Sequence, residues 1–233
     1  MWEKKVLVVA AVVAALTWVV VSQGRYSWHQ KLTITVETPA GELSASAVSA
    51  VSWRKHWIRW DGMGWSWDLT GEAVVIEVMP GRYLFALLKG AGTTEYMGSV
   101  AAASIAGREG RVLDQALFSE VHYRSNRARG VIMVPEYQYP MLVTFDDITN
   151  PETVQEVNPE DLAAVFGEGV RLKAVTLEIT EEAVTEGRVE GVLGWMCSYK
   201  SPYRRLSGKS GAIADNELSN NLGPGSFSIG ECK

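Results

Sequence analysis

Apolar and polar residues alternate along much of the chain after residue 30. Residues 31–38 and 43–53 both alternate with a period of two, and the turn sequence Pro-Ala-Gly at 39–41 lies between them. This pattern predicts two half-buried strands that pair as a hairpin. Residues 72–78 and 82–88 repeat the pattern around a Pro-Gly turn. The first part of the domain is therefore predicted to be an antiparallel meander.

The segment from 139 to 185 carries the clearest local signals. Residues 141–145 form a continuous apolar run, which predicts a buried strand. The sequence Asn-Pro-Glu-Asp then places an N-cap, a proline and two acids at the start of a helix predicted over 159–166, and Gly167 ends it. Residues 170–180 predict a long strand, and a change of phase at 174–175 predicts a β-bulge within it.

Further helices are expected at 94–106 and 187–196. The elements together predict an α+β fold: an antiparallel, meander-type sheet with two to four short helices, preceded by one N-terminal hydrophobic helix that is a transmembrane or signal segment. The chain divides into a signal anchor or signal peptide at 1–24, a globular α+β domain at 25–196 and a loosely ordered C-terminal tail at 197–233.

Residues 6–22 contain no charge and are almost all aliphatic. As a helix they would span about 26 Å, just short of the ~30 Å hydrocarbon core of a bilayer. An uncleaved signal anchor is favoured, because Val-Val-Ser at 20–22 is a poor cleavage site. Lys4 and Lys5 precede the run, which favours a single-pass protein of the bacterial inner membrane with its domain in the periplasm. Secretion after cleavage is the alternative.

The composition of the chain limits the kinds of molecule that it can bind. Of its 233 residues, 47% are hydrophobic and 21% charged, which suits a packed domain. A net charge of −5 argues against general nucleic-acid binding, which needs a basic face. Export of the domain would allow Cys197 and Cys232 to pair, but two isolated thiols are the favoured interpretation.

Five of the nine tryptophans lie within residues 53–67, interleaved with basic residues. One interpretation is a strand pair, turned at Asp61-Gly62, whose indole rings fill the core. The other is an exposed patch that contacts a membrane, a glycan or a lipid. The candidate contact residues are Trp57, Trp60, Trp65 and Trp67.

An acidic turn follows the buried strand at 141–145. Its oxygen-bearing side chains suit a hard cation such as calcium, although the spacing of an EF-hand is missing. The alternative is ordinary turn chemistry, in which these side chains accept bonds from nearby backbone amides. The calcium candidates are Asp146, Asp147, Asn150 and Glu152.

Catalytic motifs such as HExxH, GxSxG and CxxC are missing from the sequence. Gly-Lys-Ser at 208–210 resembles the end of a P-loop, but Tyr203 replaces the required first glycine. No cofactor is predicted, and a non-enzymatic interaction or structural role with an unknown protein partner is favoured. The alternative is a hydrolase with a dispersed site drawn from Asp146, Asp147, Glu178 and His122.

The segment PMLVTFDDITNPETVQEVNPEDLAAVFGEGVRLKAVTLEIT, together with KLTITVETPAGELSASAV, GEAVVIEV, RYLFALL and the closing GSFSIG, resembles an uncharacterised family of short bacterial proteins. Members of that family typically begin with a hydrophobic segment. The resemblance covers most of residues 31–228 and is densest at 139–180. It implies an exported or membrane-anchored domain, and it implies no activity.

Overall fold

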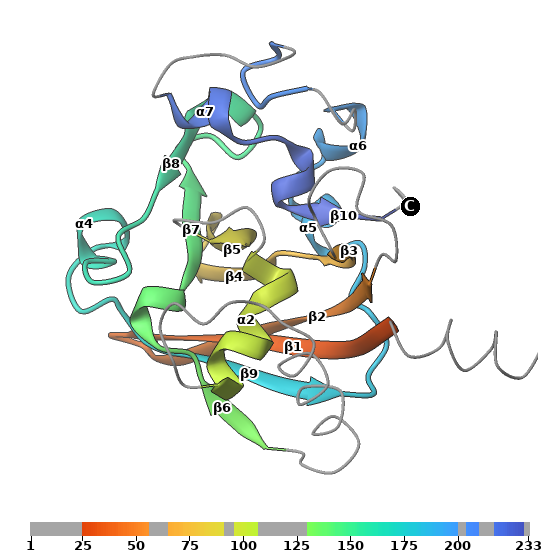
Figure 1. Ribbon diagram of the computed structural model, residues 1–233. Helices are drawn as coiled ribbons and strands as arrows, with labels where there is room; N and C mark the ends of the chain where they lie inside the picture. The colour runs from red at the N-terminus through yellow and green to blue at the C-terminus, as the bar shows by residue number, and fades with distance from the viewer. Residues whose placement is uncertain are drawn as a thin grey trace, which may run out of the picture.

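The computed structural model describes residues 25–55, 65–90, 96–106, 130–199, 204–209 and 217–230. In these ranges the fold is mostly β, with two antiparallel sheets and five short α-helices (Figure 1). The strands are β1 Arg25–Thr38, β2 Gly41–Lys55, β3 Trp65–Glu72, β4 Val74–Met79, β5 Arg82–Gly90, β6 Val131–Met133, β7 Pro140–Phe145, β8 Val154–Glu156, β9 Arg171–Thr180 and β10 Ser228–Ile229. The helices are α2 Tyr96–Ala106, α4 Ala163–Phe166, α5 Arg188–Val192, α6 Met196–Tyr199 and α7 Leu218–Asn221, with the 3-10 helices η1 Glu136–Gln138, η2 Pro151–Thr153 and η3 Pro224–Ser226.

The strands form two sheets and the described ranges contain five short α-helices, which corrects the prediction of one meandering sheet with two to four helices. The large sheet has the order β10-β3-β2-β1-β9-β6, and the small sheet has the order β4-β5-β7-β8. The predicted hairpins β1–β2 and β4–β5 are both present and antiparallel. The chain changes sheet between β3 and β4, where only Ala73 separates the two strands. Period-two alternation predicts strands but does not determine which strands pair. The sequence pattern therefore did not predict that the strands divide into two sheets.

The main core lies between the two sheets. Every second residue of β1 points inward, so that Leu32, Ile34 and Val36 are almost fully buried. Residues of the small sheet, including Ile76 and Leu142, belong to the same hydrophobic cluster. The alternation seen in the sequence of β1 therefore corresponds to one face on the core and one face outward.

A second core lies on the opposite face of the small sheet. Phe85 and Val143 are fully buried there, and the residues around them come from α5, α6 and the C-terminal segments. Strand β7 is consequently buried at all of its positions. Burial on both faces explains why residues 141–145 form a continuous apolar run instead of an alternating one.

The C-terminal segments 204–209 and 217–230, assigned above to a loosely ordered tail, supply much of this second core. Leu206, Leu222 and Phe227 are each 0% exposed. The ring of Phe227 packs edge-on against Phe85, with ring centroids 5.8 Å apart. These apolar residues are widely spaced in a polar, glycine-rich sequence, so no periodic pattern in the sequence predicts that they are buried.

Helix α2 confirms the helix predicted at 94–106, and buried polar side chains fasten it to the large sheet. The Gln30 amide donates to the carbonyl of Met97 at 2.8 Å and accepts from the Trp28 indole N–H at 2.8 Å. The Trp53 indole donates to the carbonyl of Gly98 at 2.7 Å. A β-carbon at Gly98 would lie 2.8 Å from the Trp67 ring, so only glycine allows this close approach.

Two local predictions need adjustment. Helix α4 begins at Ala163, not at Pro159, because the Asn158 side chain accepts from the Glu160 N–H and closes a separate turn first. The bulge predicted at 174–175 falls one residue earlier: Thr35 pairs with Ala174 and Val36 with Leu172, which leaves Lys173 unpaired.

The membrane prediction is not tested by the part of the chain that the structure describes. Within the described ranges, no helix is long and apolar enough to cross a membrane, and the apolar run at 6–22 lies outside them.

Cys197 is disulfide-bonded. The chain's other cysteine, Cys232, lies outside the described residues.

Replacing Phe227 by alanine should lower the free energy of unfolding by about 3–5 kcal/mol, because it empties the centre of the second core. Urea unfolding of the full-length protein in detergent would measure the loss. Ile229→Ala is the matched control, since Ile229 is 36% exposed and should cost about 1 kcal/mol or less. A loss for Phe227→Ala as small as that of Ile229→Ala would contradict the role of Phe227 in the second core.

Candidate functional site

The outer face of the large sheet, directed away from the small sheet, is rich in hydroxyl groups. Because side chains alternate along each strand and register partners share a face, the pairing of β1 with β2, and of its neighbours, fixes which residues are on it. Small hydroxyl side chains dominate. They are Ser27, Thr33, Thr35, Ser44, Ser46, Ser52, Thr70, Thr176 and Thr180.

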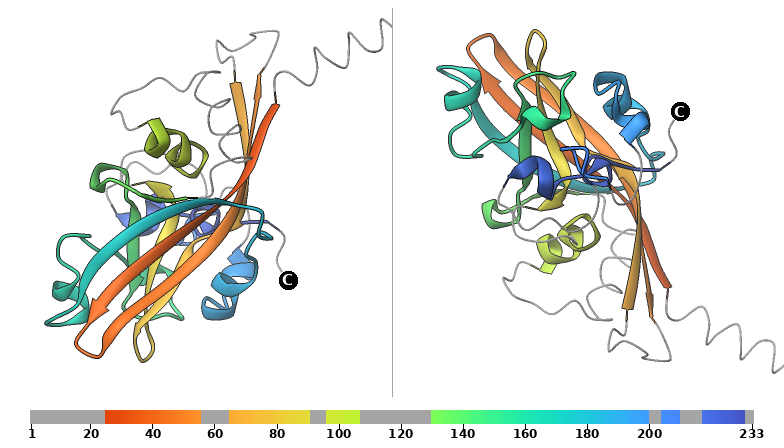
Figure 2. Two further views of the ribbon diagram at one scale, coloured as in Figure 1. Left: turned by 90° about the horizontal axis from the view of Figure 1, so that it is seen from below. Right: turned by 90° about the horizontal axis from the view of Figure 1, so that it is seen from above.

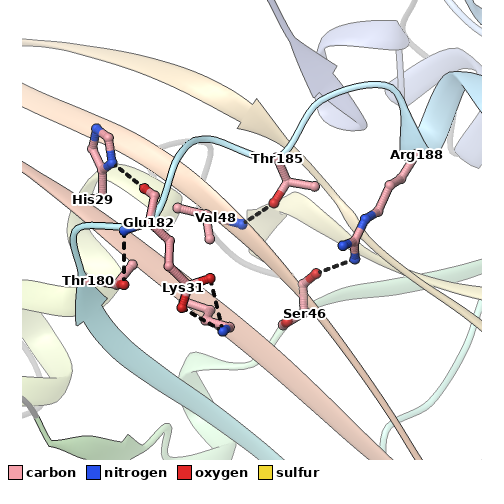
Figure 3. Close-up of polar contacts among 8 residues, drawn as sticks. All are labelled: His29, Lys31, Ser46, Val48, Thr180, Glu182, Thr185 and Arg188. Atoms are coloured by element: carbon pink, nitrogen blue, oxygen red, sulfur yellow. Dashed lines mark hydrogen bonds and ion pairs between the residues drawn. The ribbon is translucent and has the colours of Figure 1, made fainter.

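A segment that we call the strap, residues 181–188, crosses this outer face after the end of β9 (Figure 3). Near its start, the Glu182 carbonyl accepts from the ring Nδ1 of His29 at 2.7 Å, and the Glu182 carboxylate pairs with the Lys31 ammonium at 2.8 Å. At its end, the guanidinium of Arg188 donates to the carbonyl of Ser46 at 3.0 Å. The strap is therefore bonded to both β1 and β2.

The strap also completes the hydrogen bonds of β2. Strand β3 pairs with β2 only from Ala50 to Lys55, so the outer edge of β2 has no strand partner at Val48. There the Val48 N–H donates to the Thr185 hydroxyl at 2.8 Å, and the Val48 carbonyl accepts from the Thr185 N–H at 3.0 Å. Val48 is consequently buried although it belongs to the outer face.

Glu72, the last residue of β3, holds the end of the strap. Its side chain is 2% exposed, and its carboxylate accepts from the Arg188 N–H at 3.0 Å and from the Val189 N–H at 3.2 Å. Burial raises the pKa of Glu72; the Val189 N–H bond opposes this rise, and the nearby Glu190 carboxylate adds to it. This carboxylate therefore fastens α5 beside the point where the chain changes sheet.

A hollow of about 520 Å³ lies on the outer face, on the other side of the strap from Ser46. Rows of paired residues form its floor. One row is Ser27, Ser52 and Asp68; the next contains His29 and Ala50. The full lining is Arg25, Ser27, Trp28, His29, Ala50, Val51, Ser52, Asp68, Thr70, Thr180 and Glu181.

The His29 ring has a fixed orientation in this lining. A carbonyl oxygen can only accept, so Nδ1 of His29 must donate in its bond to Glu182. In the neutral ring, Nε2 is then the acceptor. On the rim, the Arg54 guanidinium pairs with Asp68 at 2.9 Å. The hollow thus offers hydroxyls, an imidazole, carboxylates and guanidinium groups on rigid strands, an arrangement that can bind a polar ligand through many hydrogen bonds.

Of the predicted tryptophan patch, Trp67 is the residue whose side chain the structure describes. Its ring is on the inner face, half-buried, and stacks on Trp53 with centroids 6.2 Å apart. Trp67 thus follows the core interpretation. Trp57 and Trp60 lie outside the described residues, as does the side chain of Trp65.

Three side chains of the acidic turn make the local hydrogen bonds that the turn-chemistry interpretation expects, and the calcium site stays a prediction. The Asp147 carboxylate accepts from the Thr149 N–H at 2.9 Å and from the Thr149 hydroxyl at 2.7 Å. The bond from the hydroxyl, followed by that from the N–H, lowers the pKa of Asp147. The Asn150 side chain accepts from the Glu152 N–H, and Asp146 accepts from the Gln155 amide at 2.5 Å. One side-chain oxygen of Asp146, of Asp147 and of Asn150 thus accepts a bond within the turn or from neighbouring β8.

The dispersed hydrolase site is not assembled by its described members. Glu178 is on the outer face of β9 in the large sheet. Asp146 and Asp147 follow β7 of the small sheet, which packs against the opposite, inner face. His122 lies outside the described residues.

Sequence reasoning missed the hollow. The available signal was the period-two placement of Ser27 and His29 ahead of Lys31, the first residue of the strand recognised at 31–38. Extending that strand back to Arg25 would have put these residues on one outward face. Their neighbours Ser52, Asp68 and Glu181 come from other strands and the strap, and only the pairing brings them together.

No family model, curated protein or solved structure matches the chain. The resemblance to an uncharacterised bacterial family therefore stays a prediction.

Adding excess calcium is expected to leave the melting temperature unchanged relative to a chelator, because Asp147 and Asn150 each already use a side-chain oxygen to accept bonds within the turn. Tryptophan emission is a second readout, since the Trp195 indole donates to the carbonyl of Ile148 in this turn at 2.9 Å. A calcium-dependent shift that disappears in Asp147→Ala would instead establish a cation site.

Glu72→Gln should change the pH dependence of stability in a defined direction. The native pKa is raised above the ordinary 4.5, so native Glu72 binds its proton more tightly than the unfolded chain does. Its contribution is complete below the unfolded pKa and is lost as pH rises through the native pKa. The glutamine side chain cannot ionise, so this variant should gain stability relative to wild type with rising pH.

Urea unfolding from pH 4 to 8 would measure this difference, with Glu77→Gln as the control because Glu77 is exposed. Parallel stability curves for wild type and Glu72→Gln would contradict the assignment of a raised pKa.

Proposed function

We propose that the protein is a membrane-anchored, non-enzymatic binding module whose domain faces the periplasm and whose ligand occupies the hollow on the outer face of the large sheet. The observation that carries the binding role is the hollow itself. Its hydrogen-bonding groups come from neighbouring strands in register, so their spacing is fixed by the sheet and not by mobile loops. The anchoring role rests on the apolar run at 6–22.

The chemistry of the lining favours a polar ligand with several hydroxyl or amide groups, such as a glycan or an extended peptide. Ser27, Ser52 and Thr70 can each donate and accept, and Asp68 accepts. Small hydroxyl side chains also lose little conformational entropy when they bind. Charged ligands of one sign are less favoured, because cationic Arg25 and anionic Glu181 both line the hollow.

Position-specific photo-crosslinking in living cells would test this role. A photoreactive amino acid at Ser52, in the hollow, should give a defined adduct with the full-length protein. The same residue at Ser44 should not, because Ser44 is on the same strand and face but beyond the strap. In a His29→Ala background the Ser52 adduct should decrease severalfold. Equal adducts from Ser44 and Ser52 would contradict binding in the hollow.

Two further measurements address the remaining parts of the proposal. The full-length protein should stay in the membrane pellet after alkaline carbonate, and protease added to spheroplasts should digest the domain. Turnover of any substrate in a hydrolase panel, abolished by His29→Ala, would contradict the non-enzymatic role.

A further inference from the structure

Three strand ends meet at one end of the large sheet. Arg25, the first residue of β1, pairs with Arg54 near the end of β2, and Lys55 pairs with Trp65 at the start of β3. Figure 2 shows these strand ends together, extending away from the body of the domain. We call this the proximal end; the opposite end of the β1–β2 hairpin, at the turn 39–40, is the distal end.

The proximal end is close in sequence to the apolar run. Only Gln23 and Gly24 separate Ser22, the last residue of that run, from Arg25. Three residue steps span at most about 11 Å even when fully extended. If the run is the membrane anchor proposed above, on which this inference rests, the proximal end must lie at the bilayer surface. The distal end is roughly 40 Å further along β1 at about 3.3 Å per residue.

The charges of the proximal end point to what it contacts. Arg25 and Arg54 are direct register partners on the outer face, and both are exposed. Like charges directly opposite each other destabilise a sheet unless something compensates them. Asp68 pairs with Arg54, whereas Arg25 forms no ion pair within the described ranges.

We propose that the proximal end of the large sheet docks directly onto anionic phospholipid headgroups of the membrane that holds the anchor, with Arg25 and Arg54 as contact residues. A phosphate-bearing surface supplies the negative charge that Arg25 lacks within the described ranges, and each basic residue near such a surface adds to the binding. Docking would place the hollow next to the lipid headgroups, because Ser27 and Ser52, which line it, lie only two residues along their strands from Arg25 and Arg54.

Depth-dependent quenching in nanodiscs would separate docking from simple tethering. A fluorescent amino acid is placed at Ser66, in the proximal row, or at Ala40, in the distal turn. A flexible Gly/Ser linker of about 20 residues, with a root-mean-square span of roughly 25 Å, is inserted between Gly24 and Arg25. In discs containing anionic lipid and headgroup spin labels, Ser66 should be quenched and Ala40 should not, with and without the linker.

Charge variants of the linker-extended protein test the contact residues. Arg25→Gln and Arg54→Gln should each reduce the ratio of docked to undocked domain about fivefold, and high salt should act in the same direction. Arg171→Gln is the matched control, because Arg171 is an exposed arginine on the same face, paired with Glu37 towards the distal end. It should leave quenching unchanged.

The outcomes distinguish this inference from the proposed function. Loss of Ser66 quenching on linker insertion alone would overturn docking while leaving the anchor intact. Equal quenching in discs of neutral lipid, or no effect of the arginine variants, would overturn the anionic contact. Extraction of the full-length protein by alkaline carbonate would instead contradict the membrane anchor itself.

Discussion

The central strands of the small sheet are buried on both faces, and the rest of the structure depends on covering them. Every residue of β7 and the middle of β5, residues 84–88, are buried, so these strands need an apolar layer on each side. The large sheet covers one face through its alternating strands, and α5, α6 and the C-terminal segments cover the other. Without the second cover, Phe85, Val143 and Phe145 would face water, which costs about 1.5–3 kcal/mol for each large side chain.

Covering the second face imposes a path on the chain. After β9 the backbone must travel from the large sheet to the far side of the small sheet, and it does so as the strap. The strap uses the β2 edge that β3 leaves free when it changes sheet, and buried Glu72 receives it at α5. The hollow next to the strap is thus a consequence of the same crossing, since Glu181 forms part of its lining.

The proposed binding site and the proposed membrane contact both lie on the face of the large sheet that the core does not use. The inner face of β1 is committed to packing, and its outer face is free to carry serine, histidine and arginine side chains. Since a strand holds residues of one face at fixed spacing, small side chains there can define a binding surface without disturbing the core. The proximal end of this face also lies nearest in sequence to the apolar run, which links the proposed binding role to the proposed membrane contact.

The sequence by itself determined the elements whose signals are local. Period-two alternation located β1, β2, β4, β5 and β9, and the continuous apolar run located β7. Local patterns also predicted both hairpins, helix α2 and, within one residue, the bulge at Lys173, because turn residues and side-chain period act over a few residues.

Only the tertiary structure decided the division into two sheets, the burial of Phe227 in the second core and the grouping of His29 with Asp68 and Glu181. Each of these depends on contacts between segments far apart in the chain. The alternating pattern of one strand shows which of its residues face the core, but it does not specify which other strand it pairs with.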